Sequence, residues 1–500
     1  MPTEPTGTPD TETLIRRFLQ RSRRPALWEP GEELLELTPE NYLLERHAGR
    51  LILQAWDDAR TTTRRVVRIA VQRPGRLEIE VERFARRTGR LVLVDLASAA
   101  RTPVERHAGR LVLRERLRMA LARQWPRWEV PELSAEPDLE HSLSPVFPRA
   151  LLQRGSRAWA ALMAPETAAA GALSFGLVWL DYLRRRERSR EIEGLVLFLP
   201  DGREHATCLR LAWLDPHMAS YQVFVYTEEG GEEPVDPADY GNLDTALGPP
   251  PGTSSWGQDP SAAWLAGLRG IPGIETVSLS SDVLSLRARG LEFARVEEGG
   301  LRAGIGRKKH AAPESTQQVA RMAIELSRVR DPQTGDPRHP FYRLQPERWL
   351  ESQVRAAISR IDPTLLPEPI YSQVPAMAGC ERDVVDLLAV DRRGRLAVLE
   401  LKASADIHLP LQALDYWLRV RWHLERGEFE ANGYFPRIEL RRQAPRLLLV
   451  APALEFHPTT ETILRYFRPE IEVERIGLGV EWRKDIQIVF RARGAQAPDC

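Results

Sequence analysis

Three polar side chains in the C-terminal third of the chain have the types and spacing needed for metal-assisted chemistry on a phosphate ester. They are Asp386, Glu400 and Lys402, which lie in the segments ERDVVDLLAV and RLAVLELKA. Side chains alternate across a strand, so Glu400 and Lys402, two residues apart, share one face. The run LAVLEL is typical of a buried strand, where a charge must be paired or bound to a metal. The pattern therefore predicts a reaction centre on a strand pair.

The chemistry that this trio could support is hydrolysis of a phosphodiester. Carboxylate oxygens from Asp386 and Glu400 are the hard ligands that Mg²⁺ (or Mn²⁺) prefers. Such a metal polarises the phosphate and lowers the pKa of a bound water, and Lys402 could orient or deprotonate that water. Only four of the 70 basic residues are lysines, the other 66 being arginines. A lysine kept in such a chain is a candidate for a task that arginine cannot perform.

The elements around these residues can be predicted from the same stretch. VVDLLAV and RLAVLELKA are expected to pair as a hairpin through the turn DRRG, which brings Asp386 towards Glu400. A helix is predicted before the hairpin, over 346–363, with Glu351 at the edge of its apolar stripe. A second helix is predicted after it, over 408–427, with Gln412 and Tyr416 on one face and Arg419 continuing that face.

This arrangement resembles the PD-(D/E)xK nuclease superfamily, and within it the C-terminal domain of NucS-type (EndoMS-type) endonucleases. The resemblance covers residues 341–493 and implies Asp386 and Glu400 as metal ligands and Lys402 as the catalytic lysine. It further implies Glu351 as the acid of the first helix and Gln412 as the glutamine of the second. The rest of the chain does not resemble the NucS N-terminal domain, so mismatch specificity is not implied. Val385 stands where the motif has proline.

Other interpretations stay open at this stage. An Asp…Glu-x-Lys triplet can arise by chance on a surface hairpin with an exposed ion pair. A nuclease fold can also bind nucleic acid without cutting it, or serve as a scaffold in a defence or repair complex. The leading expectation is a Mg²⁺-dependent DNA endonuclease of repair or defence, with a homodimer or other subunits of such a complex as compatible partners.

The expected fold class is multidomain α/β. We expect a restriction-endonuclease-like α/β/α core with a mixed sheet at the C-terminus, preceded by a β-rich N-terminal domain and an α/β middle domain. The predicted divisions are a tail, a β-rich basic domain, an α/β domain, a Pro/Gly-rich linker, a small strand-rich segment with a helix, and the nuclease-like domain. Their respective bounds are 1–35, 36–128, 129–246, 247–262, 263–335 and 336–500.

The β-rich region is a candidate nucleic-acid surface. Between Asn41 and Trp128 it holds 20 arginines against nine acids, with tryptophans interleaved. Arginines next to aromatic rings suit phosphate contact with base stacking. Arg64, Arg65 and Arg68 are the candidate contacts here, and Tyr416 and Arg419 are the candidates in the C-terminal domain. Solvated arginines on the outer faces of strands are the competing interpretation.

The composition limits the classes of binding partner that can be expected. The net charge is zero, which weighs against a general nucleic-acid coat but not against local patches. No apolar run reaches the ~18 residues that signal a membrane span, and the N-terminus lacks the pattern of a secretory signal. The three cysteines are far apart, so neither a disulfide framework nor a cysteine metal site is expected. These features favour a cytoplasmic protein without a membrane partner.

Overall fold

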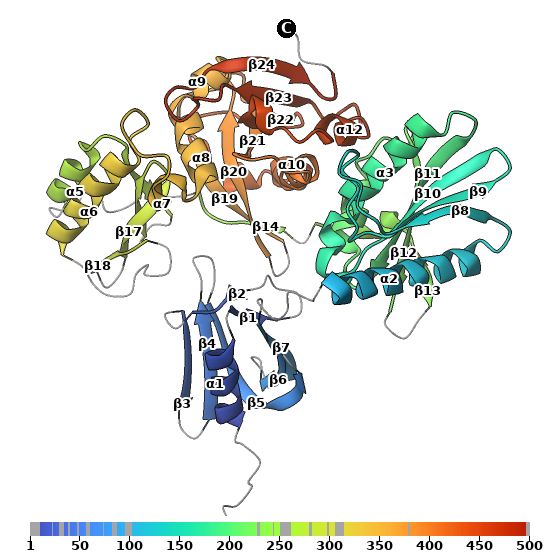
Figure 1. Ribbon diagram of the computed structural model, residues 1–500. Coiled ribbons are helices and arrows are strands. Elements are labelled where there is room, and N and C mark those ends of the chain that lie inside the picture. The colour runs from blue at the N-terminus through green and yellow to red at the C-terminus, as the bar shows by residue number, and fades with distance from the viewer. Residues whose placement is uncertain are drawn as a thin grey trace, which may run out of the picture. The chain divides into compact units, whose positions relative to one another are not determined.

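The computed structural model describes residues 11–22, 24–29, 35–38, 41–47, 50–56, 61–73, 75–82, 88–95, 103–227, 231–243, 245–250, 262–279, 283–297, 300–305, 315–378 and 381–496. The chain divides into two compact units. The first combines Met1–Gly109 with Arg302–Pro313, and the second combines Arg110–Leu301 with Glu314–Cys500. The protein is multidomain α/β, and its described residues form four separate sheets (Figure 1).

In the described residues of the first unit, helix α1 packs on a seven-stranded antiparallel sheet. Its strand order is β2-β1-β7-β6-β5-β4-β3, and α1 packs Ile15 and Leu19 into the core of the sheet. The bounds are α1 Thr11–Arg21, β1 Pro25–Trp28, β2 Leu35–Glu36, β3 Tyr42–His47, β4 Arg50–Trp56, β5 Thr61–Arg73, β6 Arg76–Glu82 and β7 Thr88–Asp95.

Part of the segment predicted as a tail, 1–35, belongs to this sheet. β1 pairs with β7 through four residues, because Ala26 and Leu27 are apolar and find partners in the apolar β7. The segment PALW is too short to carry a strand pattern of its own. A four-residue segment gains its stability from long-range pairing, which no local pattern reports.

The segment GRLVLRERL, at 109–117 in the predicted β-rich domain, alternates like a strand but forms the middle of helix α2, Pro103–Gln124. Leu113, Leu117 and Leu121 recur every four residues and pack on the middle sheet, which fixes helical spacing. The boundary predicted at residue 128 is therefore too late, since α2 packs with the middle domain. The heptapeptide ERHAGRL occurs in the β3–β4 hairpin region at 45–51 and inside α2 at 105–111.

The middle domain has a six-stranded mixed sheet of order β13-β12-β11-β10-β9-β8. Strands β10, β11 and β12 are parallel to one another, and the remaining pairs are antiparallel. The bounds are β8 Glu129–Ser134, β9 Arg149–Arg154, β10 Arg157–Met163, β11 Glu191–Pro200, β12 Ser220–Tyr226, β13 Glu232–Val235, α3 Ala172–Arg186 and α4 His205–Leu211, with a 3-10 helix at Glu166–Gly171 and another at Pro237–Tyr240. The segment CLRLAWL, which alternates like a strand, forms most of α4 because Cys208 and Leu211 bury on one helical face.

The small strand-rich segment forms a four-stranded antiparallel sheet of order β15-β16-β17-β18 with helices before and after it. The bounds are α5 Ala262–Arg269, β15 Ile274–Ser278, β16 Leu284–Ala288, β17 Leu291–Glu297, β18 Gly300–Ala303, α6 Thr316–Val329 and α7 Pro340–Arg343. Arg330, fully buried, donates to the carbonyls of Leu344 (2.8 Å) and Arg289 (3.0 Å) and lies over the ring of Trp349. These contacts fix the segment against the helix that starts the C-terminal domain.

The C-terminal domain has a seven-stranded mixed sheet of order β14-β19-β20-β21-β22-β23-β24 between helices. The bounds are β14 Thr245–Leu247, α8 Pro346–Ala356, α9 Ile358–Ile361, β19 Tyr371–Ala378, β20 Glu381–Val390, β21 Leu396–Leu401, α10 Leu409–Glu425, α11 Glu428–Ala431, β22 Arg446–Pro452, α12 Thr460–Leu464, β23 Val473–Leu478 and β24 Ile488–Arg493, with a 3-10 turn at Ala453–Glu455. Residue 247, predicted to start a linker, ends the edge strand β14, while 251–261 lie outside the described residues.

The predicted hairpin is confirmed as β20 and β21, which pair antiparallel from Leu387–Leu399 to Val390–Leu396. Its turn is held by Asp391, whose Oδ1 accepts from the backbone N–H groups of Arg393 and Arg395. Gly394 has φ +83, and a Cβ there would lie 2.1 Å from the carbonyl oxygen of Glu439. The turn residues therefore set the register that places Asp386 opposite Glu400.

Two helices sandwich this hairpin, as predicted. On one face α8 buries Leu350, Val354 and, just after it, Ile358 against the sheet. On the other face α10 packs Leu414 and its neighbours against β21 and β22. No helix in the described part of the chain is long and apolar enough to cross a membrane.

Candidate functional site

The candidate site lies on the β20–β21 hairpin, near the C-terminal end of β21. Asp386 precedes the last paired residues of β20, and its Oδ2 accepts a hydrogen bond of 3.0 Å from the backbone N–H of Leu401. Glu400, in β21, is 1% exposed, and its Oε2 has no hydrogen-bond partner in the described structure. A buried carboxylate oxygen without a partner is costly unless a cation completes its coordination.

The two carboxyl groups affect each other's protonation. Burial, followed by the negative charge of Glu351, raises the pKa of Asp386 to about 6. Burial and then the neighbouring Asp386 raise the pKa of Glu400 well above its ordinary value. Two acids that share a dry site disfavour joint ionisation, and a divalent cation is the group that would relieve this.

Lys402 supplies the positive charge of the site. Its Nζ lies 3.8 Å from Glu400 Oε1 and 3.6 Å from Asp406 Oδ2, and the side chain is only 13% exposed. Burial by itself lowers the pKa of Lys402, but the carboxylates, Glu400 first among them, outweigh it and raise the pKa. This favours an ammonium that orients water and neutralises charge, while deprotonation of a water by Lys402 stays a prediction.

Glu351 reaches the edge of the site but is held by arginines. It is 4% exposed, its Oε2 accepts 2.8 Å from Arg348 Nη1, and Arg287 Nη1 lies 4.0 Å from its Oε1. Arg287 comes from β16, so the small sheet contributes to the surroundings of the site. Glu351 therefore acts on Asp386 through its charge.

The residues predicted on the second helix are placed differently. Gln412 donates from Nε2 to the hydroxyl of Tyr416 at 3.1 Å, rather than to either carboxylate. Tyr416 and Arg419 are 5% and 7% exposed. Side chains with so little exposed surface can make few direct contacts with a nucleic acid, because such contacts require accessible donors.

The sequence interpretation missed two acids. Glu347, one turn before Glu351 on α8, raises the pKa of both Glu400 and Lys402. Asp406, in the loop before α10, pairs with Lys402. The spacing of Glu347 and Glu351, four residues apart on one helix, was a signal available in the sequence.

The fit of a divalent cation to these residues is partial. Asp386 and Glu400 offer hard oxygen ligands, one of them unpartnered, as Mg²⁺ or Mn²⁺ requires. Within the ranges described, no group of three or more His, Cys, Asp and Glu side chains has the geometry to hold a metal ion. A two-carboxylate site suits a cation that keeps several of its waters, as Mg²⁺ does.

The N-terminal arginines belong to the first unit, on β5. Each lies beside a carboxylate: Arg64 beside Glu29 at 2.7 Å, Arg65 beside Glu82, and Arg68 beside Glu80 at 2.6 Å. Glu29 is 2% exposed, which gives the Arg64 pair a structural role. Arg65 and Arg68 are more exposed, with 42% and 66% of the side-chain surface accessible. Contact of these arginines with nucleic acid stays a prediction.

No protein-family model matches the chain, and comparison with curated proteins gives no match. The functional assignment therefore depends on the geometry of the site and on the resemblance of its motif.

The raised pKa of Asp386 predicts a measurable change in stability. Without metal, Asp386→Asn is expected to raise the free energy of unfolding at pH 7 by up to about 3 kcal/mol, at ~1.4 kcal/mol per pKa unit. The variant is expected to be more stable because Asp386 is harder to ionise in the folded protein than in the unfolded chain. The free-energy cost of its ionised form is fully present above pH 6 and vanishes below the unfolded pKa of ~3.9. Denaturant melts of both proteins across pH 4 to 8 measure it.

The control for this measurement is Asp485→Asn, which removes an exposed carboxylate paired with Arg360. That change is expected to leave stability within ~0.5 kcal/mol at every pH. A destabilised Asp386→Asn protein at pH 7 would contradict the electrostatic description of the site.

Proposed function

We propose that the C-terminal domain is a metal-dependent nuclease of the PD-(D/E)xK type that hydrolyses phosphodiester bonds, most simply in DNA. The observation that carries the proposal is the cluster of Asp386, Glu400 and Lys402 on one hairpin. Two buried carboxylates with raised pKa values face each other, and an ammonium lies 3.8 Å from one of them. A structural ion pair needs only one acid beside the lysine, whereas a site that binds a metal ion and a phosphate needs two carboxylates and an ammonium.

In this mechanism the chain's own residues divide the work. Asp386 and Glu400 would hold Mg²⁺ or Mn²⁺, which supplies Lewis-acid polarisation of the phosphate when bound. Lys402, kept charged by its carboxylate neighbours, orients the attacking water and offsets charge on the scissile phosphate. Arg348 and Arg287 hold the Glu351 carboxylate at the edge of the site.

A second candidate function is nucleic-acid binding or scaffolding by a nuclease fold that does not cut, for instance in a repair or defence complex. The observation in its favour is that Glu351 pairs with arginines and Gln412 turns to Tyr416. Only three of the five residues predicted as catalytic therefore converge on one point.

A cleavage panel separates the two functions. Labelled single- and double-stranded DNA and RNA would be incubated with the purified chain in Mg²⁺, Mn²⁺ or EDTA. The nuclease proposal expects products with Mg²⁺ or Mn²⁺ and none with EDTA, and DNA as the preferred polymer. A folded protein that binds these polymers but cuts none of them in either metal would favour the second candidate.

The first unit is expected to contribute to DNA affinity. Charge reversal at Arg64, Arg65 and Arg68 should weaken DNA binding and flatten its salt dependence, because each lost phosphate contact reduces the slope of log K against log salt by ~0.9. Fluorescence anisotropy over a series of salt concentrations measures both quantities.

The double variant Arg65→Glu/Arg68→Glu is the matched control, since it leaves the Arg64–Glu29 pair and its buried carboxylate intact. It is expected to reproduce about two-thirds of the change in slope. Equal affinity and slope for wild type and both variants would place the DNA on another surface.

A further inference from the structure

The sheets of the middle and C-terminal domains have the same connectivity. In each, three antiparallel strands come first: β8, β9 and β10 in one, β19, β20 and β21 in the other. In each, the third strand then pairs in parallel with the fourth and the fourth with the fifth, and an antiparallel strand closes the edge. Six strands thus succeed one another in the same order and direction twice in one chain.

The helices occupy corresponding places as well. A helix before the first strand, α2 or α8, covers one face of the sheet. The crossover after the third strand forms α3 or α10 on the other face, and the next crossover forms the short α4 or α12. Residues 103–235 therefore repeat the architecture of residues 346–493.

The two copies pack against each other in a reciprocal way. Helix α3 of the first copy contacts α12 of the second, and α10 of the second contacts α4 of the first. Helix α3 corresponds to α10, and α4 corresponds to α12, so the two contacts are equivalent and exchange the roles of the copies. This reciprocity is the defining property of an interface with two-fold symmetry.

The centre of the interface confirms that symmetry at the level of single residues. Leu214 forms an antiparallel bridge with Phe467, and each is the third residue after the end of its short helix, α4 or α12. The pseudo-two-fold axis therefore passes between Leu214 and Phe467.

Hydrogen bonds next to that bridge are related by the same axis. The N–H of Asp215 donates to the carbonyl of Tyr466 at 2.7 Å, and the N–H of Arg468 donates to the carbonyl of Trp213 at 3.1 Å. Asp215 and Arg468 each come directly after the bridging residue, while Trp213 and Tyr466 each precede it.

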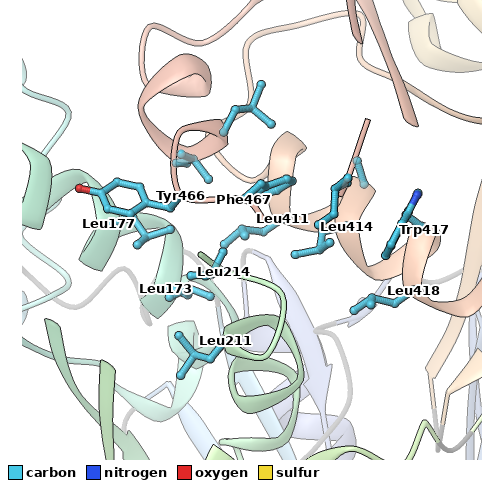
Figure 2. Close-up of a cluster of buried hydrophobic side chains, with 14 of the residues drawn as sticks. Leu173, Leu177, Leu211, Leu214, Leu411, Leu414, Trp417, Leu418, Tyr466 and Phe467 are labelled. Carbon is cyan, nitrogen blue, oxygen red and sulfur yellow. The ribbon is translucent and has the colours of Figure 1, made fainter. Parts of the chain in front are cut away.

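The charged contacts are reciprocal too. Arg210, on α4, pairs with Asp415 of α10 at 2.6 Å, and Arg465, beside α12, pairs with Asp181 of α3 at 3.4 Å. Between these pairs the leucines of both copies form one continuous apolar core (Figure 2). Figure 2 shows Leu173, Leu177, Leu211 and Leu214 of the first copy facing Leu411, Leu414, Tyr466 and Phe467 of the second.

Among the described residues, only the second copy carries the two carboxylates and the lysine of the proposed reaction centre. The strand that corresponds to β21 is β10, and its side chains facing α3 are Ala158, Ala160 and Leu162. Leu162 pairs with Arg149 across the hairpin, as Glu400 faces Asp386 in the second copy. An apolar residue and a buried arginine thus stand where the second copy has two carboxylates.

We infer that this chain contains within itself a pseudo-dimer of two nuclease folds with a single reaction centre, and that it cuts one strand of duplex DNA in each binding event. The inference rests on the proposed function. Two-fold protein symmetry matches the two-fold symmetry of a DNA duplex. A symmetric pair with two centres can reach both backbones, whereas this pair presents Asp386, Glu400 and Lys402 to one backbone only.

The test is the time course of supercoiled plasmid cleavage in Mg²⁺, with sedimentation of the full chain at the assay concentration. The expected result is a monomer that converts the plasmid to the nicked circle. Linear product should stay absent until at least ten times as many nicks have accumulated as are needed for that conversion. Linear product formed without a nicked intermediate would overturn the inference while leaving the nuclease function standing. No cleavage of any polymer would refute the proposed function and, with it, this inference.

A second measurement does not depend on activity. Mn²⁺ binding, followed by electron paramagnetic resonance, is expected to be lost altogether in the Asp386→Ala/Glu400→Ala double variant. Tight Mn²⁺ binding that survives in that variant would reveal a second centre and overturn the inference, even if the plasmid is nicked. Asp485→Asn, which alters an exposed carboxylate, is the control and should bind Mn²⁺ as wild type does.

Discussion

Glu400→Ala and Asp386→Ala are each expected to reduce the single-turnover rate of cleavage by at least ~10³-fold, equivalent to ~4 kcal/mol of transition-state stabilisation. Both carboxylates lie at the point where the cation would bind, and Glu400 Oε2 has no other partner in the described structure. Loss of either ligand removes the polarisation of the phosphate rather than the affinity for the polymer. The assay is cleavage of pre-bound, labelled DNA after addition of Mg²⁺.

The matched control is Asp485→Asn, since Asp485 is an exposed carboxylate of the same domain that pairs with Arg360. It should cut at the wild-type rate. Thermal unfolding must first establish that Glu400→Ala and Asp386→Ala are folded, and the raised pKa values of both acids favour stable variants. Wild-type rates in both alanine variants would show that the reaction centre is elsewhere or absent.

The hairpin that carries the site could be predicted because several local signals agree on it. Alternation places Glu400 and Lys402 on one face, the Asp391–Gly394 turn fixes the register, and the apolar neighbours require a buried strand. Such agreement between turn chemistry and hydrophobic pattern is what makes a local prediction reliable.

The contacts of the site were harder to predict because they come from distant parts of the chain. Arg287 approaches Glu351 from a sheet that ends some fifty positions earlier in the sequence, and it changes what Glu351 can do. Gln412 was placed on the correct helix, yet its partner is Tyr416, four residues along the same helix. A sequence pattern gives the face of a helix, but the identity of the nearest partner depends on rotamers and tertiary packing.

The heptapeptide ERHAGRL illustrates the same limit for the fold. In the first occurrence, residues 45–47 and 50–51 lie in the paired strands β3 and β4, and the second occurrence, at 105–111, is helical. The two heptapeptides are followed by different residues. After the second heptapeptide, Leu113, Leu117 and Leu121 recur with helical spacing and pack against the middle sheet. Local propensity is therefore overridden by the tertiary surface that each copy meets. The same reasoning explains CLRLAWL, whose strand-like alternation gives way to α4 at the interface between the middle and C-terminal domains.

Lys402→Arg is expected to lower the cleavage rate by at least ~10²-fold, the low end of the cost of losing one positioned electrostatic donor, while DNA affinity changes by only a few-fold. Arginine replaces lysine at 66 of the 70 basic positions, so a lysine that served only as a surface charge would tolerate the change. Lys402 is instead 13% exposed, with Nζ 3.8 Å from Glu400 and 3.6 Å from Asp406. A guanidinium is larger and planar, so it cannot place one compact donor between those carboxylates without displacing the phosphate.

Lys484→Arg is the matched control, because Lys484 is exposed and pairs with Glu481 outside the site. It should cut as wild type does in saturating Mg²⁺ under single-turnover conditions. The pH dependence of the rate decides between two explanations of a slow Lys402→Arg enzyme. The carboxylates raise the pKa of Lys402, which favours a role as an ammonium that orients water and neutralises charge. The rate deficit of Lys402→Arg should then stay constant from pH 6 to 9. A deficit that disappears at either end of that range would indicate proton transfer by Lys402, and near-normal cutting would reduce Lys402 to a charge contact.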